Sequence, residues 1–398
     1  MKSSLRWGFK TLFVLLSACS RHQAVGPSTV YRLPWPAENG VYQLQNVSLS
    51  TLVEPQALRG LDARIIVDPS SSANGIEGPD PIGRYVDADG VRVPADFTTL
   101  QAITVYAHLE GLRRLDKKLG VESLLSWPLN VGILVHINEH DRLLENNALY
   151  DGILNALLIV PYTASALPIT LNAGILAHEH FHSLFYAAVL SAVGEARQND
   201  AFLSQVNESF SLDTNTASSG KAGALPLRSY NLGVLRGFNE GLADFWGWVY
   251  TGDTQFMSRS IAKTEERRGL DLKTQPVPAA STLAARLASQ SEGDILAEAY
   301  LLGTAYARFL HDLVVSMNGP TPTRGQREDM AKKIIESLPV LRQRIQAKVK
   351  LELISPRLLF DVLAPRLKGL SDKSCQVAQE FVVSDLAGVV VPEGCAPK

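Results

Sequence analysis

The sequence predicts an α+β protein, with a small N-terminal mixed or antiparallel sheet over a helix and a mainly helical part after it. The stretch 19–97 is rich in Pro, Gly, Ser and Val, and turn signals such as Asp87-Ala88-Asp89-Gly90 are typical of short strands and loops. From residue 98 onward, apolar residues recur at helical spacing over long segments. Because 46% of the 398 residues are hydrophobic, the chain can bury a large core.

The first residues have the pattern of an export signal. A basic start precedes the apolar run 11–16, which is too short to span a membrane. The run ends in Leu16-Ser17-Ala18-Cys19, which resembles the bacterial lipobox. This resemblance implies a lipoprotein signal peptide over 1–18, acyl chains on Cys19 and attachment to a bilayer in the bacterial cell envelope. Ser20 after the cysteine resembles the outer-membrane default of Gram-negative bacteria. The alternatives are an ordinary signal peptide and a buried cysteine.

The elements after the signal can be placed in order. A tether is expected to lead into short strands and loops. Thr98–Leu119 is predicted as an amphipathic helix that ends at Gly120. Strands are expected near Val131–Ile137 and Ala156–Val160, because both runs are short and apolar.

These elements divide the chain into parts with different composition. We expect a tether and β/loop-rich region over 19–97 and a central unit over 98–250, which contains a polar inserted loop at 191–230. A mainly helical subdomain is expected over 251–370, and a tail over 371–398. Within the subdomain, 254–291 is expected to be a polar excursion, and the charges of the helical segment 327–348 are expected to form a solvated face.

The most informative motif is His178-Glu179-His180-Phe181-His182, in an apolar segment that follows the plausible helix cap Asn172. On a helix, His178 and His182 lie on one face and can bind one Zn²⁺ through neutral nitrogens. Glu179 lies at the rim of that face, where it can take a proton from metal-activated water. Such a match arises by chance in roughly one such chain in a hundred, and the three histidines could instead line one face of a strand. The Ala- and Leu-rich residues that follow favour the helix.

A second motif, Asn239-Glu240-Gly241-Leu242-Ala243-Asp244, lies in a helical segment at roughly Leu232–Tyr250. A catalytic zinc site takes three protein ligands and leaves one position for water, and two His with one Glu form such a set. Glu240 is therefore the candidate third ligand, and Asp244 can orient a ligand histidine through its second ring nitrogen. The alternative is a solvated acidic face, but two acids on an otherwise apolar helix need a partner.

Together the motifs resemble the thermolysin-like zinc metallopeptidases, the gluzincins, in which H-E-x-x-H is followed by N-E-x-x-x-D. The resemblance implies a zincin-like fold with one Zn²⁺ per chain and Glu179 as general base. It also implies that Asp244 supports His178 and that Asn239 supports His182. The implied metal ligands are His178, His182 and Glu240.

The resemblance extends to Asn146-Asn147-Ala148-Leu149-Tyr150. In the family this segment leads into the edge strand above the active site. It implies that Asn147 and Ala148 contact the main chain of a peptide, which would add to the strand. The chain departs from the family in the long polar loop at 191–230, which could restrict access or act as a lid.

Peptide hydrolysis also needs a donor for the developing oxyanion. The helical segment Ala297–Met317 places Tyr300 nearest the family's donor position, with Tyr306 and His311 as fallbacks. The alternative is that Tyr300 is a core or interface residue.

The remaining His and Cys residues receive other expectations. His180 faces away from the ligand pair, so it is expected to be structural or to support a ligand. His136 and His140 could form a second metal pair, but a strand would point them differently. If the protein is exported, Cys375 and Cys395 can form a disulfide. The alternative, that they are zinc ligands, is disfavoured because no other Cys or His lies near either of them in the sequence.

The sequence thus predicts a membrane-anchored zinc endopeptidase that hydrolyses peptide bonds of a peptide or protein substrate. Two alternatives stay open: an envelope or binding lipoprotein whose catalysis is dispensable, and a cell-wall amide hydrolase. A net charge of −2 provides no basic field, so nucleic acid is not an expected partner.

Overall fold

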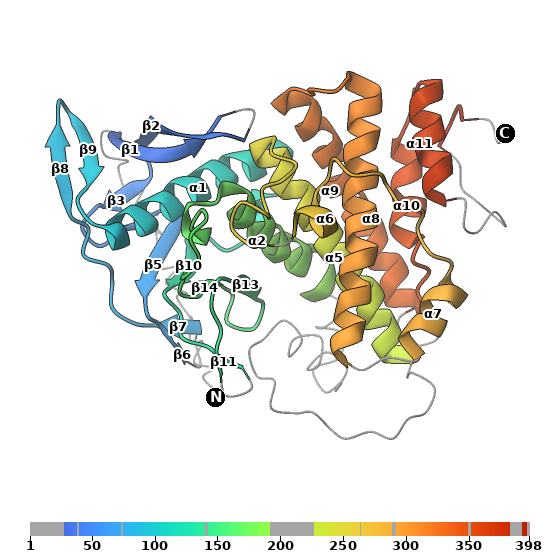
Figure 1. Ribbon diagram of the computed structural model, residues 1–398, viewed down its shortest axis with the longest axis horizontal. Helices are drawn as coiled ribbons and strands as arrows, with labels where there is room; N and C mark the ends of the chain where they lie inside the picture. The colour runs from blue at the N-terminus through green and yellow to red at the C-terminus, as the bar shows by residue number, and fades with distance from the viewer. Residues whose placement is uncertain are drawn as a thin grey trace, which may run out of the picture.

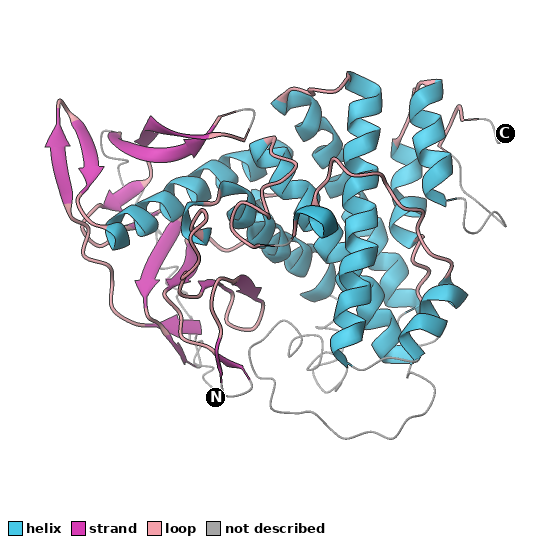
Figure 2. Ribbon diagram, in the orientation of Figure 1, coloured by secondary structure: helices cyan, strands magenta, loops and turns pink. Residues whose placement is uncertain are grey.

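The fold is mixed α+β, which confirms the predicted class, with strands in the N-terminal part and helices in the C-terminal part (Figures 1 and 2). The computed structural model describes residues 28–37, 40–72, 75–139, 142–191, 227–262, 264–288, 292–348, 352–382 and 392–395. Cys19, His140 and most of the 191–230 loop lie outside the described residues. The proposed domain boundaries stay predictions.

The strands form two main sheets, and both are mixed rather than purely antiparallel. The first has the order β2 (Tyr42–Leu49), β1 (Thr29–Pro36), β9 (Val91–Pro94), β8 (Tyr85–Ala88), with only β1 and β9 parallel. The second has the order β13 (Ala148–Asp151), β14 (Ala156–Ile159), β10 (Leu129–Ile133), β5 (Ala63–Val67), β4 (Arg59–Gly60), β3 (Leu52–Glu54). Two small hairpins are β6 (Ser70–Ser72) with β7 (Gly75–Glu77), and β11 (Asn138–Glu139) with β12 (Arg142–Leu143).

Helix α1 (Phe97–Leu119) packs against both sheets and joins them into one core (Figure 1). It begins at Asp96, whose carboxylate accepts the amide of Thr99 at 2.7 Å, and it ends at Gly120 in the left-handed region, with φ 78°. The predicted helix Thr98–Leu119 is therefore confirmed. Its burial on most sides explains why its polar residues have specific partners.

The predicted strand Val131–Ile137 is too long. Strand β10 ends at Ile133, because Leu134 adopts a φ of 57° and turns the chain out of the extended conformation. Val135 and Ile137 are still buried, in a small apolar cluster on the other side of the sheet. The apolar run therefore continued past the end of the strand, which is why the sequence pattern overestimated its length.

Helix α2 (Ala173–Phe185) carries the histidine motif and continues into a wider turn at η3 (Tyr186–Leu190). Asn172 caps it as predicted, accepting the amides of Gly174 and Ile175 at 3.0 and 3.2 Å. The Asn172 side-chain amide also donates to the carbonyl of Phe256 at 2.8 Å. The start of α2 is thus tied to the segment that follows α5.

The C-terminal helices surround α5 (Leu227–Thr251), which packs against both α2 and the long helix α8 (Glu292–Asn318) (Figure 1). The segment 254–291, expected to be a polar excursion, contains α6 (Glu265–Arg268) and α7 (Ala280–Ala288). The remaining helices are α9 (Arg324–Lys348), α10 (Leu358–Leu363) and α11 (Asp372–Val382), and the short helical turns are η1 (Glu122–Leu124), η2 (Ile169–Leu171) and η4 (Ala364–Arg366).

Two further findings concern the ends of the chain. Cys375 on α11 and Cys395 form a disulfide, which joins the last described residues to the helical part. Within the described ranges, none of the helices combines the length and the apolar character that crossing a bilayer requires.

The charged face expected on α9 is only partly solvated. Arg327 and Glu328 are 5% and 6% exposed, because the start of α9 packs beside α1 and the end of α5. Glu328 is paired there with Lys118 of α1 and with Arg324. This corrects the expectation that the charges of this segment simply face water.

A buried histidine in the core should make stability depend on pH. His108 of α1 is fully buried, and burial lowers its pKa to about 3 from an ordinary value of 6.5. The unfolded chain therefore binds a proton that the folded chain excludes, so stability is full above pH 6.5 and falls as the pH drops toward 3.

We expect this residue to contribute up to about 1.4 kcal/mol per pH unit to the loss of stability in that window. His108→Phe keeps an aromatic ring but cannot titrate. If its free energy of unfolding at pH 7 is lower than that of the wild type, urea unfolding at several pH values should show this difference shrinking as the pH falls. A difference in the free energy of unfolding that stays constant between pH 7 and 4 would contradict the lowered pKa of His108.

Candidate metal centre

The two histidines of the motif face each other in the interior of the protein. The Nε2 atoms of His178 and His182 are 3.0 Å apart, with the rings at 83° to each other. Both side chains are buried, because α2 is enclosed by α1, α5 and the sheet. The helix and the shared face predicted from the four-residue spacing are present.

Glu179 completes a group that could hold a metal ion. The ligand atoms of His178, Glu179 and His182 all lie within 4.8 Å of one another. Burial, reinforced by the charge of Glu240, raises the pKa of Glu179 to about 8, although His178 opposes the shift. Among the described residues, its Oε2 atom has no hydrogen-bond partner.

Glu240 of α5 reaches the same point from the opposite side. Its Oε2 lies 3.5 Å from Nε2 of His178, and its Oε1 lies 3.8 Å from Nε2 of His182. Bonds of about 2.0–2.2 Å in a tetrahedral zinc site place neighbouring ligand atoms roughly 3.3–3.6 Å apart. The distances in the cluster bracket this range, so the donor set fits such an ion with only small side-chain movements.

Asp244 lies one turn further along α5 and approaches the other nitrogen of the first histidine. Its Oδ1 is 3.0 Å from Nδ1 of His178, which is an ion-pair distance, although Nδ1 makes no well-formed hydrogen bond to any described residue. Burial alone would lower the pKa of His178, but Asp244 raises it overall. In His182, burial and the neighbouring His178 lower the pKa to about 4, which favours the neutral ring that binds metals.

Asn239 affects His182 less directly than expected. Its side chain raises the pKa of His182 slightly against the larger effect of burial. However, within the described part of the chain neither its Oδ1 nor Nδ1 of His182 makes a well-formed hydrogen bond. The two residues are neighbours, and the supporting contact stays a prediction.

The sequence reasoning missed Arg268, the last residue of α6. Its guanidinium binds both carboxylate oxygens of Asp244, at 2.6 and 3.0 Å, and Oε2 of Glu240 at 3.2 Å. Burial would raise the pKa of Asp244, but Arg268 and His178 hold it below its usual range. The two acids on an apolar helix indicated that a partner was needed, but the segment 254–291 offers several basic residues and no spacing rule selects one of them.

Tyr300 lies beside this cluster. Its ring is 4.9 Å from the Arg268 guanidinium, and the charge of Glu240, followed by burial, raises its pKa. The position depends on a close helix contact, because a Cβ at Gly303 would come within 3.0 Å of Cβ of Glu240, and one at Gly241 within 2.4 Å of the Gly303 carbonyl. The two glycines let α5 and α8 touch, which brings Tyr300 next to Glu240.

The fallback donors lie in other contacts. Tyr306 is buried in the core, where its hydroxyl donates to the carbonyl of Pro356 at 2.6 Å. His311 packs edge-on against Trp248 and contacts Asp312. Neither contact involves the histidine cluster.

The remaining histidines also have separate environments. His180 points away from the pair and bonds Oδ2 of Asp116 on α1 at 2.8 Å, so it is structural. His136 is exposed and contacts Asp68, and its suggested partner His140 lies outside the described residues.

The asparagine segment leads into an edge strand, as expected. Strand β13 begins at Ala148 and pairs only with β14 within the described sheet. Asn147 accepts the amide of Ala148 at 3.0 Å, and the backbone of Tyr150 lies close enough to Glu179 to lower its pKa slightly. The edge of the sheet is therefore adjacent to the histidine motif.

No model of a known protein family matches this chain, and no curated protein matches it either. The function of the chain is therefore inferred from the geometry of the cluster and from the resemblance of its motifs.

The bond between Arg268 and Asp244 should be important for stability. Arg268→Gln would leave Asp244 buried beside Glu240 with less positive charge, so we expect a loss of about 3 kcal/mol or more in the free energy of unfolding. Arg84→Gln is the control, because Arg84 is 67% exposed and only 3.8 Å from Asp96. Urea unfolding should separate the two variants, and equal stabilities would contradict the role given to Arg268.

The contact between α5 and α8 gives a second expectation. Gly303→Ala would force the helices apart, and we expect a cost of about 1–3 kcal/mol together with weaker metal binding. Gly325→Ala provides the control, because nothing lies within 4 Å of a Cβ built there. If Gly303→Ala is as stable as that control in thermal unfolding, the helices are not held by this contact.

Proposed function

We propose that the protein is a zinc-dependent hydrolase of peptide bonds. The observation that carries the proposal is the convergence of His178, Glu179, His182 and Glu240, from two helices, on one buried point. Imidazole nitrogens and a carboxylate oxygen are ligands suited to Zn²⁺. The resemblance of both motifs to the gluzincins supports the same reaction.

In this proposal His178, His182 and Glu240 hold the ion. A bound zinc ion would supply a Lewis acid, which polarises a carbonyl group and makes water acidic near neutral pH. Asp244 would fix the orientation of the His178 ring, and Arg268 would keep Asp244 ionised.

Glu179 is the proposed general base. Its buried carboxylate lies at the rim of the ligand face, with Oε1 3.9 Å from Nε2 of His178. It would accept a proton from the attacking water and pass it to the leaving amine. Tyr300 is the proposed donor to the oxyanion, because it adjoins Glu240 and is only partly buried.

Strand β13 is the proposed docking edge for substrate. An extended peptide could pair with the edge that no described strand occupies, with Asn147 and Ala148 contacting the peptide main chain. Such pairing would hold a peptide bond above Glu179 without demanding particular side chains. Substrate preference would then depend on the loops around the edge.

We further propose that the protein is a lipoprotein of the bacterial cell envelope. The support is the sequence Leu16-Ser17-Ala18-Cys19 after a basic and apolar start. Acyl chains on Cys19 would anchor the enzyme without a spanning helix. Its substrates would then be peptides or proteins outside the cytoplasm.

The decisive experiment measures metal content and peptide cleavage in the same preparations. We expect about one zinc per chain in the wild type, and strong loss of zinc in His182→Ala and Glu240→Gln. Glu179→Gln should keep its zinc but cleave casein or a quenched peptide about 10²- to 10⁴-fold more slowly. Folded wild-type protein that binds no zinc would contradict the proposal.

One observation favours a second candidate, a non-catalytic envelope or binding protein on the same scaffold. Arg268 already neutralises Asp244 and contacts Glu240, so the cluster has a cation of its own. In that case Glu179→Gln would restore function in a deletion strain as well as the wild type does. A cell-wall amide hydrolase would share the proposed site, and cleavage of peptidoglycan peptides but not of casein would identify it.

A further inference from the structure

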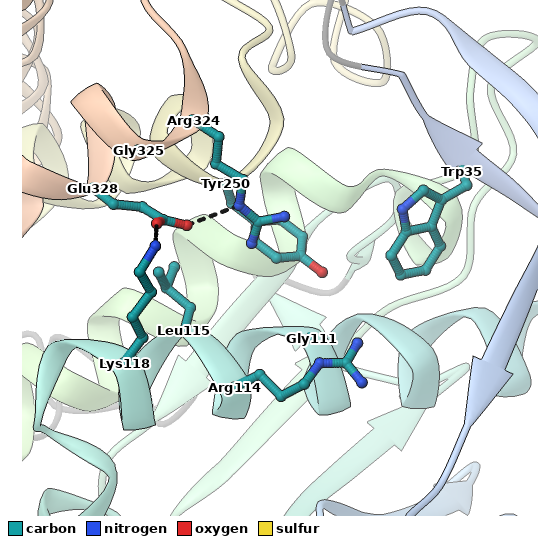
Figure 3. Close-up of a pocket in the computed structure, with 9 residues that line it drawn as sticks. All are labelled: Trp35, Gly111, Arg114, Leu115, Lys118, Tyr250, Arg324, Gly325 and Glu328. Atoms are coloured by element: carbon teal, nitrogen blue, oxygen red, sulfur yellow. Dashed lines mark hydrogen bonds and ion pairs between the residues drawn. The ribbon is translucent and has the colours of Figure 1, made fainter. Parts of the chain in front are cut away.

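A cavity of about 370 Å³ lies where β1, α1, the end of α5 and the start of α9 meet (Figure 3). Tyr250, on its wall, is ten residues after Glu240 on α5. At 1.5 Å per residue, this places the cavity roughly 15 Å along the helix from the candidate metal centre. The cavity is therefore separate from that centre, and its volume is in the range of small-molecule sites.

Two aromatic rings form fixed walls of this cavity. Trp35 stacks on the buried ring of His108, with centroids 4.1 Å apart and planes at 18°. The Tyr250 hydroxyl lies 3.3 Å from Nδ1 of His108. Gly111 provides the space for that hydroxyl, because a Cβ there would come within 2.4 Å of it. Neither ring can turn away without breaking these contacts.

Arg114 of α1 forms another side of the cavity. Its side chain is 59% exposed, and Nη1 contacts Glu110 at 2.7 Å. The Glu110 carboxylate also accepts hydrogen bonds from Ser50 and Thr51, so its charge is shared among several donors. In Figure 3 the guanidinium extends toward Trp35, and the Tyr250 hydroxyl points into the same space. The other edge of the guanidinium can therefore bind a ligand.

The opposite side carries two more cations and one acid. Lys118 and Arg324 both pair with Glu328, whose pKa they lower against the effect of burial. Arg324 also lies over the Tyr250 ring, 5.5 Å from its centroid. It is the first residue of α9, so the partial positive charge of that helix end adds to the positive charge of these side chains. The lining thus holds three cationic side chains and one carboxylate.

We propose that this cavity binds a small organic anion, in which a carboxylate or phosphate group is joined to a flat apolar group. Arg114 would bind the anionic oxygens through two parallel N–H donors. The apolar group would rest against Trp35 and Tyr250, which are already held in place. The site does not depend on the proposed peptidase activity, since no metal-centre residue lines the cavity.

Phenyl phosphate is a suitable probe, because it combines a ring with an anion. Isothermal titration of the purified protein should show saturable binding of phenyl phosphate. Inorganic phosphate, which lacks the ring, and benzylamine, which reverses the charge, should each bind about tenfold more weakly or not at all. Benzoate should bind if a carboxylate serves as well as a phosphate.

Two variants test whether binding occurs in this cavity. Arg114→Gln removes the exposed cation and should weaken phenyl phosphate binding about tenfold or more. Gly325→Leu should abolish it, because Gly325 lines the cavity, a Cβ there has no neighbour within 4 Å, and the larger side chain would take up space in the cavity. Lys117→Gln is the matched control, since it removes a charge from an exposed residue of the same helix outside the cavity.

Three results would overturn the proposal: no saturable binding to the wild type at millimolar probe, equal affinity for inorganic phosphate, or binding unchanged in both Arg114→Gln and Gly325→Leu. The last result would place the anion elsewhere, for example on a metal at the histidine cluster, which all the variants retain. Thermal unfolding of each variant shows whether it is folded, and Gly325→Ala provides a smaller change in the same direction if the leucine variant is not.

Discussion

The pairing of Asp244 with Arg268 and His178 is the contact on which the candidate metal centre depends. A buried carboxylate is tolerated only where its charge is balanced, and Asp244 is balanced from both sides. The same contacts join α6 and α5 to α2, which lies more than forty residues earlier in the sequence. The arrangement of ligands is therefore a property of the helical packing as much as of the motifs.

The metal-ligand candidates could be found from sequence because their relationships are local. Two histidines four residues apart share a helix face wherever that helix lies, and the same is true of Glu240 and Asp244. The caps at Asn172 and Gly120 are local signals as well, and both helix ends were located correctly. The meeting of the two motifs at one point needed the fold.

Features that depend on distant contacts were missed or misjudged. Arg268 lies in a segment without periodicity, and its role appears only when α6 is packed over α5. Glu328 belongs to a sequence with many charges, yet the neighbouring α1 buries it. The strand near Val131 was extended too far because the apolar run continues through Leu134, and an apolar side chain does not indicate that the backbone there adopts a positive φ.

The bond between His180 and Asp116 has a consequence for the mechanics of α2. Histidine ligands project about 5–6 Å from the helix axis, so a roll of about 10° would displace them by roughly 1 Å. Functional sites tolerate displacements of only about 0.5 Å. His180 bonds the side of α2 that faces away from the ligands to α1, while Asp244 contacts the ligand side, so rotation of α2 about its axis is restricted from both sides. His180 thus keeps the helix from rotating and so helps to hold His178 and His182 in position.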